Sequence, residues 1–195
     1  MAEGLEAGRK ALAPIAAQIW PGLPPGSMAR PLGANRSASA GAGRRSFSSR
    51  RSAITFIRDG FHCRYCGGET VPRPIAVLMS SLYPAELPYT MHYKAGMMHP
   101  LYWTRVAEAD HLVPGSAGGA WTDPENHVTA CVVCNTRKGR HSVEQIGWTL
   151  RSSAGIRTEW DGLTAIYRPI WERAGRISED YHRPWLKMFD RSDLG

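Results

Sequence analysis

The chain has 195 residues, and its 43% hydrophobic content supports one domain with a modest core and excludes a wholly disordered protein. A formal net charge of +7 and a pI near 9.5 indicate a polyanionic partner, without distinguishing DNA, RNA or an anionic membrane surface. The sequence contains no internal repeat and no apolar stretch long enough to span a bilayer, so we expect no transmembrane segment.

Residues 1–51 are expected to form a flexible basic arm that could include a short helix. From Arg30 to Arg51 the sequence consists mainly of Arg, Ser, Ala and Gly and contains no acidic residue. Too few apolar groups are available to offset the entropy of ordering, so this part either contacts phosphates nonspecifically or serves as a solvated linker. An export signal is disfavoured, because Glu3, Glu6 and Pro14 interrupt the pattern that such signals require.

A globular domain is expected over residues 52–140. Ile54 and Ile57 are three residues apart and Asp59-Gly60 follows them, which predicts a short helix that ends there. A long insertion follows at about residues 69–103. Its aromatic side chains could stack on bases or pack internally, and the sequence leaves both readings open.

The four cysteines form two Cys-x-x-Cys pairs, Cys63 with Cys66 and Cys131 with Cys134. Each pair can bend the chain so that two thiolates converge, and two such pairs complete a tetrahedral zinc site. A disulfide framework is the alternative, but paired knuckles favour a structural Zn²⁺ ion whose binding helps a small module to fold.

Residues 141–195 are expected to form a helical extension packed on the core. Ser142 and Gln145 have the spacing of a capping box, which predicts a helix through about Leu150. Further helices are indicated at Leu163–Trp171, where Pro169 would remove one backbone hydrogen bond, and at Tyr181–Phe189.

The central stretch carries the chemistry. Thr104–Ala109 is predicted to be a strand, and after it come, in order, Asp110-His111, Asn126 and Cys131-x-x-Cys134-Asn135-x-x-Lys138-Gly139. This order resembles the HNH endonuclease motif in its four-cysteine form. The resemblance implies an α+β fold with a ββα-metal core, in which two strands and a helix surround one divalent ion.

Hydrolysis of a phosphodiester requires an activated water, charge compensation on the phosphoryl oxygens and assistance to the departing oxygen. His111 is the candidate general base, because an imidazole with a pKa near ~6.5 is neutral at neutral pH. Asp110 and Asn135 offer hard oxygen ligands for Mg²⁺ or another divalent cation. In the family, the counterpart of Asn126 fixes the loop that orients the base, and Gly118-Gly119 would let that loop turn.

Adjacent residues of a regular strand face opposite sides, so Asp110 and His111 can serve one site only if the strand ends or bulges there. Arg137, Lys138 and Arg140 are candidate contacts to the nucleic-acid backbone. His127, next to Asn126, is interpreted as a bystander.

The sequence therefore predicts a metal-dependent DNA endonuclease with Zn²⁺ as a structural ion and Mg²⁺ or another divalent cation as the catalytic ion. The alternatives are a zinc-stabilised nucleic-acid-binding module that lacks catalysis and a secreted toxin nuclease. Reliance on reduced thiols and the disfavoured export signal lead us to expect a cytoplasmic protein of bacterial or phage origin.

Overall fold

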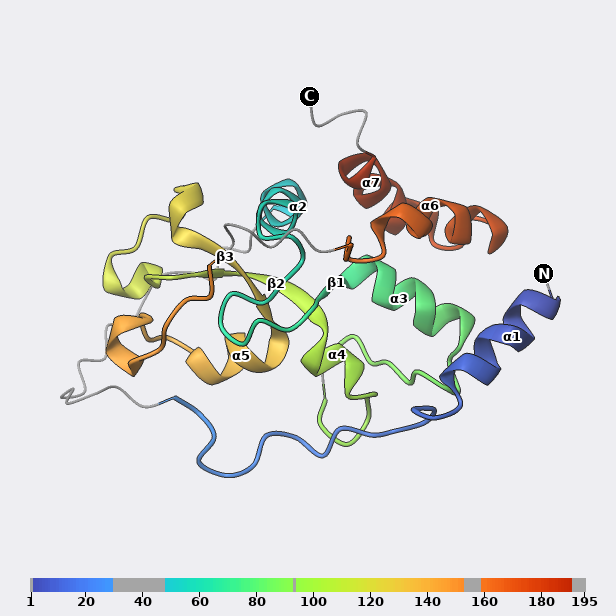
Figure 1. The fold of residues 1–195 in the computed structure, drawn as a ribbon, viewed down its shortest axis with the longest axis horizontal. Helices are drawn as coiled ribbons and strands as arrows, with labels where there is room; N and C mark the ends of the chain where they lie inside the picture. The colour runs from blue at the N-terminus through green and yellow to red at the C-terminus, as the bar shows by residue number, and fades with distance from the viewer. Residues whose placement is uncertain (1, 30–47, 93, 153–158, 191–195) are drawn as a thin grey trace.

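A computed structural model describes residues 2–29, 48–92, 94–152 and 159–190. Its sheet has three strands in the order β1-β2-β3, with β1 parallel and β3 antiparallel to β2. The strands are β1 Val71–Pro72, β2 Val106–His111 and β3 His127–Cys131. The helices are α1 Ala2–Leu12, α2 Ser49–Arg58, α3 Arg73–Leu82, α4 Leu101–Thr104, α5 Val132–Lys138, α6 Thr164–Arg173 and α7 Glu179–Phe189 (Figure 1). Short 3-10 turns are η1 Gly115–Ala117, η2 Pro124–Asn126 and η3 Glu144–Ile146.

The centre of the fold is a ββα unit formed by β2, β3 and α5. Asp110 lies opposite Val128 and His111 lies opposite His127 in the register of the two strands. Helix α5 follows β3 directly and packs on one side of the sheet, whereas α2 packs on the other (Figure 1). This arrangement confirms the predicted α+β class and the ββα-metal core. The strand begins at Val106 rather than Thr104, because Leu101–Thr104 forms a helical turn.

Helix α2 forms for local reasons and is held by its buried face. The Ser48 side chain accepts a hydrogen bond from the Arg51 amide at its start, and Asp59 is the C-cap residue. Ala53 and Phe56 face the main hydrophobic cluster. The predicted helix that ends at Asp59 is therefore confirmed.

Asp59 also connects this helix to the sheet. Its carboxylate is 1% exposed and accepts hydrogen bonds from Arg58, from Arg64 Nη1 at 3.1 Å and from the Thr129 amide at 2.7 Å. The Arg64 amide donates to the Thr129 carbonyl oxygen at 2.8 Å. The outer edge of β3 is thus paired with the segment that follows α2.

The insertion and the C-terminal helices share the main core. Helix α3 contributes Ile75 and Leu78, and α6 and α7 pack against it with Trp171 and Leu186. Both C-terminal helices were expected, and α6 contains Pro169. The prediction of a helix from Ser142 to about Leu150 was wrong.

Only the turn η3 forms in that segment, although the capping box does exist. The Ser142 amide donates to Gln145 Oε1 at 2.8 Å, and the Gln145 amide donates to Ser142 Oγ at 3.2 Å. Gly147 then takes a positive φ of 64°, which ends the helical path after three residues.

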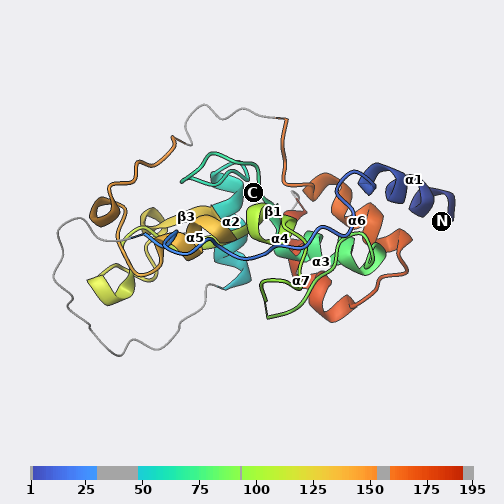
Figure 2. The same ribbon diagram turned by 90° about the horizontal axis from the view of Figure 1, so that it is seen from below.

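The N-terminal segment crosses the α4 and α5 side of the molecule (Figure 2). Trp20 stacks on Trp103 with ring centroids 6.2 Å apart, and the Ala29 amide donates to the Arg137 carbonyl oxygen at 2.7 Å. Of the flexible basic arm expected over residues 1–51, residue 1 and residues 30–47 lie outside the described residues. Among the described helices, none is long and apolar enough to cross a membrane.

Candidate active site and zinc centre

The two knuckles bring the four cysteines together. The Sγ atoms of Cys63, Cys66, Cys131 and Cys134 all lie within 4.8 Å of one another, and none of the four forms a disulfide. A tetrahedral zinc ion with Zn–S bonds of about 2.3 Å requires sulfur atoms about 3.8 Å apart. The cluster therefore fits the predicted structural zinc site, which joins the segment after α2 to the junction of β3 and α5.

The four thiols influence one another's pKa values. Hydrogen bonds from Cys131 and Cys134 lower the pKa of Cys63 to about 7, and the same two neighbours lower the pKa of Cys66. Gly67, which directly follows Cys66 in the first knuckle, has a positive φ of 78°. This is the conformation that the turn needs and that a residue without a Cβ adopts readily.

Asp110 lies on the α5 side of β2 in a closed polar network. Its Oδ2 accepts a hydrogen bond from the Tyr65 hydroxyl at 2.5 Å and lies 3.0 Å from Lys138 Nζ. Its Oδ1 accepts from the His111 amide at 2.8 Å. Lys138 is fully buried and also donates to the His111 carbonyl oxygen at 2.8 Å. Lys138 was expected at the nucleic-acid backbone, but here its charge neutralises Asp110 inside the fold.

Asn135 and Glu108 complete this face of the site. The Asn135 Nδ2 donates to Glu108 Oε2 at 2.8 Å, and Arg73 Nη2 donates to Glu108 Oε1 at 2.7 Å. Carboxylate and amide oxygens are the ligand types that Mg²⁺ prefers, so Asp110 and Asn135 have the donor chemistry for a hard divalent cation. Glu108 was not among the site residues predicted from the sequence, although its position two residues before Asp110 places both side chains on one face of the strand.

His111 directs its imidazole elsewhere, toward the loop between β2 and β3. Its ring lies 4.5 Å from the Trp121 ring and 5.0 Å from the His127 ring, both in edge contacts. Burial lowers the pKa of His111, and the neighbouring His127 lowers it further. The side chain is 8% exposed, so a neutral imidazole sits just below the surface.

Asp110 and His111 are both inside β2, which ends only after His111 and has no bulge between them, so their side chains point to different sides of the strand. The structure pairs Asp110 with Lys138 and Asn135 with Glu108. It places the His111 ring beside Trp121 and His127. His127, interpreted as a bystander from the sequence, is therefore in contact with the candidate base.

Asn126 fixes the loop that follows His111. Its Oδ1 accepts from the Val113 amide at 2.8 Å, and its Nδ2 donates to the carbonyl oxygens of Val113 and Ala120, each at 3.0 Å. The loop passes so close at Gly119 that an added Cβ would lie 1.8 Å from the Val113 carbonyl oxygen. Only glycine fits at that position.

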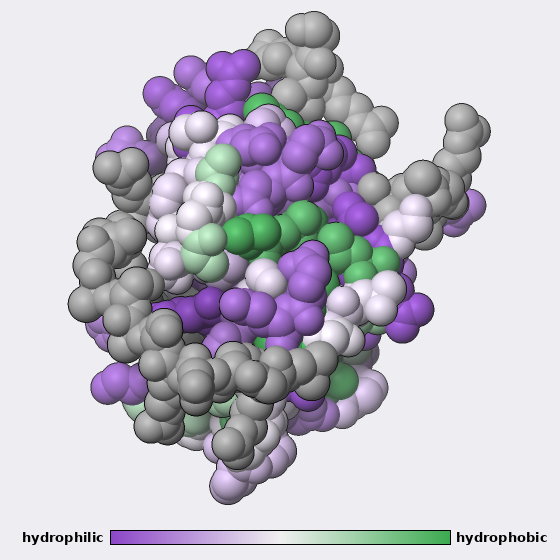
Figure 3. Space-filling view, turned by 90° about the vertical axis from the view of Figure 1, so that its left-hand side faces the viewer, coloured by the Kyte–Doolittle hydropathy of each residue, from purple (hydrophilic) through white to green (hydrophobic). Residues whose placement is uncertain are grey.

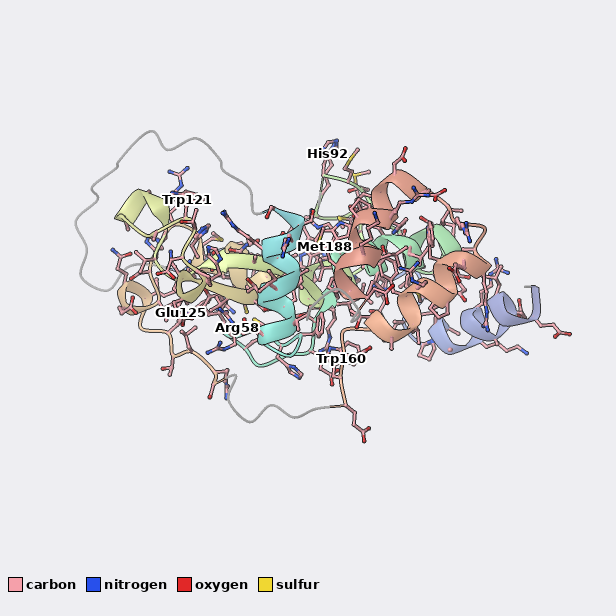
Figure 4. All side chains as sticks on the ribbon, turned by 90° about the horizontal axis from the view of Figure 1, so that it is seen from above. Arg58, His92, Trp121, Glu125, Trp160 and Met188 are labelled. Atoms are coloured by element: carbon pink, nitrogen blue, oxygen red, sulfur yellow. The ribbon has the colours of Figure 1, made fainter. Side chains whose placement is uncertain are left out.

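The end of the molecule that carries this loop has a mostly hydrophilic surface crossed by a hydrophobic band (Figure 3). Trp121 projects from the loop, and Arg58 at the end of α2 donates to the Pro124 carbonyl oxygen at 2.8 Å (Figure 4). Arg137 and Arg140 are exposed at the end of α5. Arg137 lies over the Trp148 ring at 6.0 Å.

Together, an antiparallel hairpin, the helix that follows it and a four-cysteine cluster that fits a zinc ion define a ββα-metal core. Residues 102–141 match the HNH endonuclease family model, so this part of the chain is an HNH domain. Comparison with curated proteins and with solved structures gave no match. The HNH domain supports an activity on nucleic acids in general.

Proposed function

We propose that this protein is a metal-dependent endonuclease that hydrolyses DNA phosphodiester bonds with His111 as the general base. The observation that carries the proposal is the coincidence of two features. The HNH match spans residues 102–141, and within it a buried neutral imidazole follows directly on Asp110, whose face of the strand offers hard oxygen ligands.

His111 accepts the proton of the attacking water. Its lowered pKa keeps the imidazole unprotonated at neutral pH, which is the state that a base requires. Trp121 and His127 limit the orientation of the ring, and Asn126 holds the loop that carries Trp121. Asn126 is thus a positioning residue for the base.

Asp110 and Asn135 would hold the catalytic cation, Mg²⁺ or another divalent ion. When bound, this ion supplies charge compensation on the phosphoryl oxygens. Glu108 accepts from the Asn135 amide nitrogen, which leaves the amide oxygen available as a ligand. Lys138 Nζ lies 3.0 Å from Asp110 Oδ2 and holds that carboxylate in place, and Arg137 and Arg140 contact the DNA backbone from the end of α5.

The zinc site serves the fold, and its reduced thiols are consistent with work in the cytoplasm. The alternative of a non-catalytic nucleic-acid-binding module draws support from the 8% exposure of His111, because a base must reach its water. A cleavage assay separates the two functions.

The test is cleavage of supercoiled plasmid with and without Mg²⁺, using the full chain and its His111→Ala variant. We expect the variant to lose about 10²–10⁴-fold in rate, the usual range for a general base. His92→Ala is the matched control, because His92 is exposed and lies well apart from Trp121 (Figure 4). Equal cleavage by the parent and His111→Ala would refute the mechanism, and DNA binding without cleavage by the parent would establish the alternative.

A further inference from the structure

Tyr65 lies inside the first zinc knuckle and reaches the candidate catalytic site. It occupies a position between Cys63 and Cys66, and its hydroxyl donates to Asp110 Oδ2 at 2.5 Å. The side chain is buried with only 8% of its surface exposed. Tyr65 therefore links two sites: its backbone is part of the Cys63–Cys66 knuckle, and its side chain contacts Asp110.

The ring of Tyr65 is fixed by its surroundings. It makes an edge contact with Trp148 at 5.4 Å and belongs to the hydrophobic cluster that contains Cys63, Val128 and Val143. The backbone on both sides is held as well, since the Arg64 amide donates to the Thr129 carbonyl oxygen and the Gly67 amide donates to that of Cys63, each at 2.8 Å. The position of the hydroxyl thus depends on the shape of the knuckle.

Several donors converge on the Asp110 carboxylate, and the Tyr65 hydroxyl is one of them. Asp110 Oδ2 receives Tyr65 and Lys138 together, and Oδ1 receives the His111 amide. A carboxylate with this many donors has a single orientation.

We propose that Tyr65 is a positioning residue for the catalytic cation. The zinc knuckle fixes the place of its hydroxyl, the hydroxyl fixes the orientation of the Asp110 carboxylate, and this orientation sets the affinity of the catalytic site for its divalent cation. This inference rests on the proposed function, in which Asp110 is a ligand of that cation. Groups that orient a metal ligand typically change metal affinity by about 10–100-fold when they are removed.

The test uses the zinc-loaded full chain and its Tyr65→Phe variant, which removes the hydroxyl and keeps the ring. Mn²⁺ binding is measured without DNA from the electron paramagnetic resonance signal of free Mn²⁺, and zinc content is measured by elemental analysis. We expect Tyr65→Phe to retain zinc and a cooperative unfolding transition, and to weaken Mn²⁺ binding by about tenfold or more. Plasmid cleavage should need correspondingly more Mg²⁺, with the rate at saturating Mg²⁺ near that of the parent.

Tyr102→Phe is the matched control, because Tyr102 is a fully buried tyrosine whose hydroxyl donates to the Ala76 carbonyl oxygen at 3.2 Å. It should leave Mn²⁺ binding unchanged. Unchanged or tighter Mn²⁺ binding in Tyr65→Phe would overturn the inference, and so would loss of zinc, which would make the role of Tyr65 structural. Asp110→Asn separates this failure from that of the proposed function. If the parent binds no Mn²⁺ that depends on Asp110, the proposed function itself fails.

Discussion

Replacement of Lys138 by methionine tests the central ion pair of the core. Lys138 is fully buried, and its Nζ lies 3.0 Å from Asp110 Oδ2 and 2.8 Å from the His111 carbonyl oxygen. Methionine fills similar space but leaves both acceptors without this donor. The Asp110 carboxylate, whose side chain is 11% exposed, would then keep its charge without a counterion.

Removal of one partner from a buried ion pair typically costs about 3–5 kcal/mol of folding free energy. Asp110 retains the Tyr65 hydroxyl and the His111 amide as donors, so the loss should lie near the lower end, about 3 kcal/mol. The measurement is urea unfolding of the zinc-loaded chain followed by circular dichroism. Lys187→Met, at an exposed position of α7, is the matched control and should change stability by less than about 0.5 kcal/mol.

The double variant Asp110→Asn with Lys138→Met removes both charges together. Its loss should be smaller than the sum of the two single losses by at least about 1 kcal/mol, because the unpaired charge is no longer buried. A loss below about 1 kcal/mol in Lys138→Met, or strictly additive losses, would refute the ion-pair assignment. If Lys138 contacted phosphate instead, its replacement would weaken DNA binding and its salt dependence while stability stayed unchanged.

Four further outcomes follow from the site. Because burial lowers the pKa of His111, its protonated form accumulates only below the ordinary value of about 6.5, so the cleavage rate should be level above about pH 7 and fall on acidification. A fall that already begins near pH 8 in a pH–rate profile would contradict this assignment. Asn126→Ala removes three loop hydrogen bonds and should lower the cleavage rate by about 10²-fold with zinc content unchanged. Gly119→Ala should destabilise the fold by about 1–3 kcal/mol in urea unfolding because of the contact with the Val113 carbonyl oxygen, and more than Gly118→Ala, which has open space and only a positive φ of 85°. Mild chelation should stop cleavage while circular dichroism is unchanged, and only chelation strong enough to empty the thiolate site should unfold the core; simultaneous loss of both would argue against two separate ions.

The four-cysteine cluster could be predicted from the sequence because each of its halves is a local pattern and a tetrahedral zinc site needs two such halves. Each Cys-x-x-Cys pair forms a turn from a few consecutive residues, and the second pair lies at the junction of β3 and α5. Helix α2 could be predicted for the same reason, since its hydrophobic spacing and its C-cap residue Asp59 lie within one short segment.

The contacts that could not be predicted join residues that are far apart in the sequence. Tyr65 and Asp110 are 45 residues apart, and Glu108 and Arg73 are 35 apart, so no pattern in a short window joins them. Lysine is rarely buried without a partner, so the sequence placed Lys138 at the surface. The capping box at Ser142 was correctly located, but tertiary packing and Gly147 limit it to a single turn.

The pairing of Asp59 and Arg64 with Thr129 bears on how copies of this chain can associate. An open sheet edge with unpaired amides and carbonyls invites a strand from a neighbouring molecule. The amide and the carbonyl oxygen of Thr129, in the middle of β3, are both occupied, and the opposite edge is the two-residue β1, where Pro72 lacks an amide hydrogen. Strand addition to either side of the sheet is therefore blocked. Within the described residues, an assembly with nucleic acid or with a second copy must therefore form through helices and loops, and the sheet is protected from edge-to-edge aggregation.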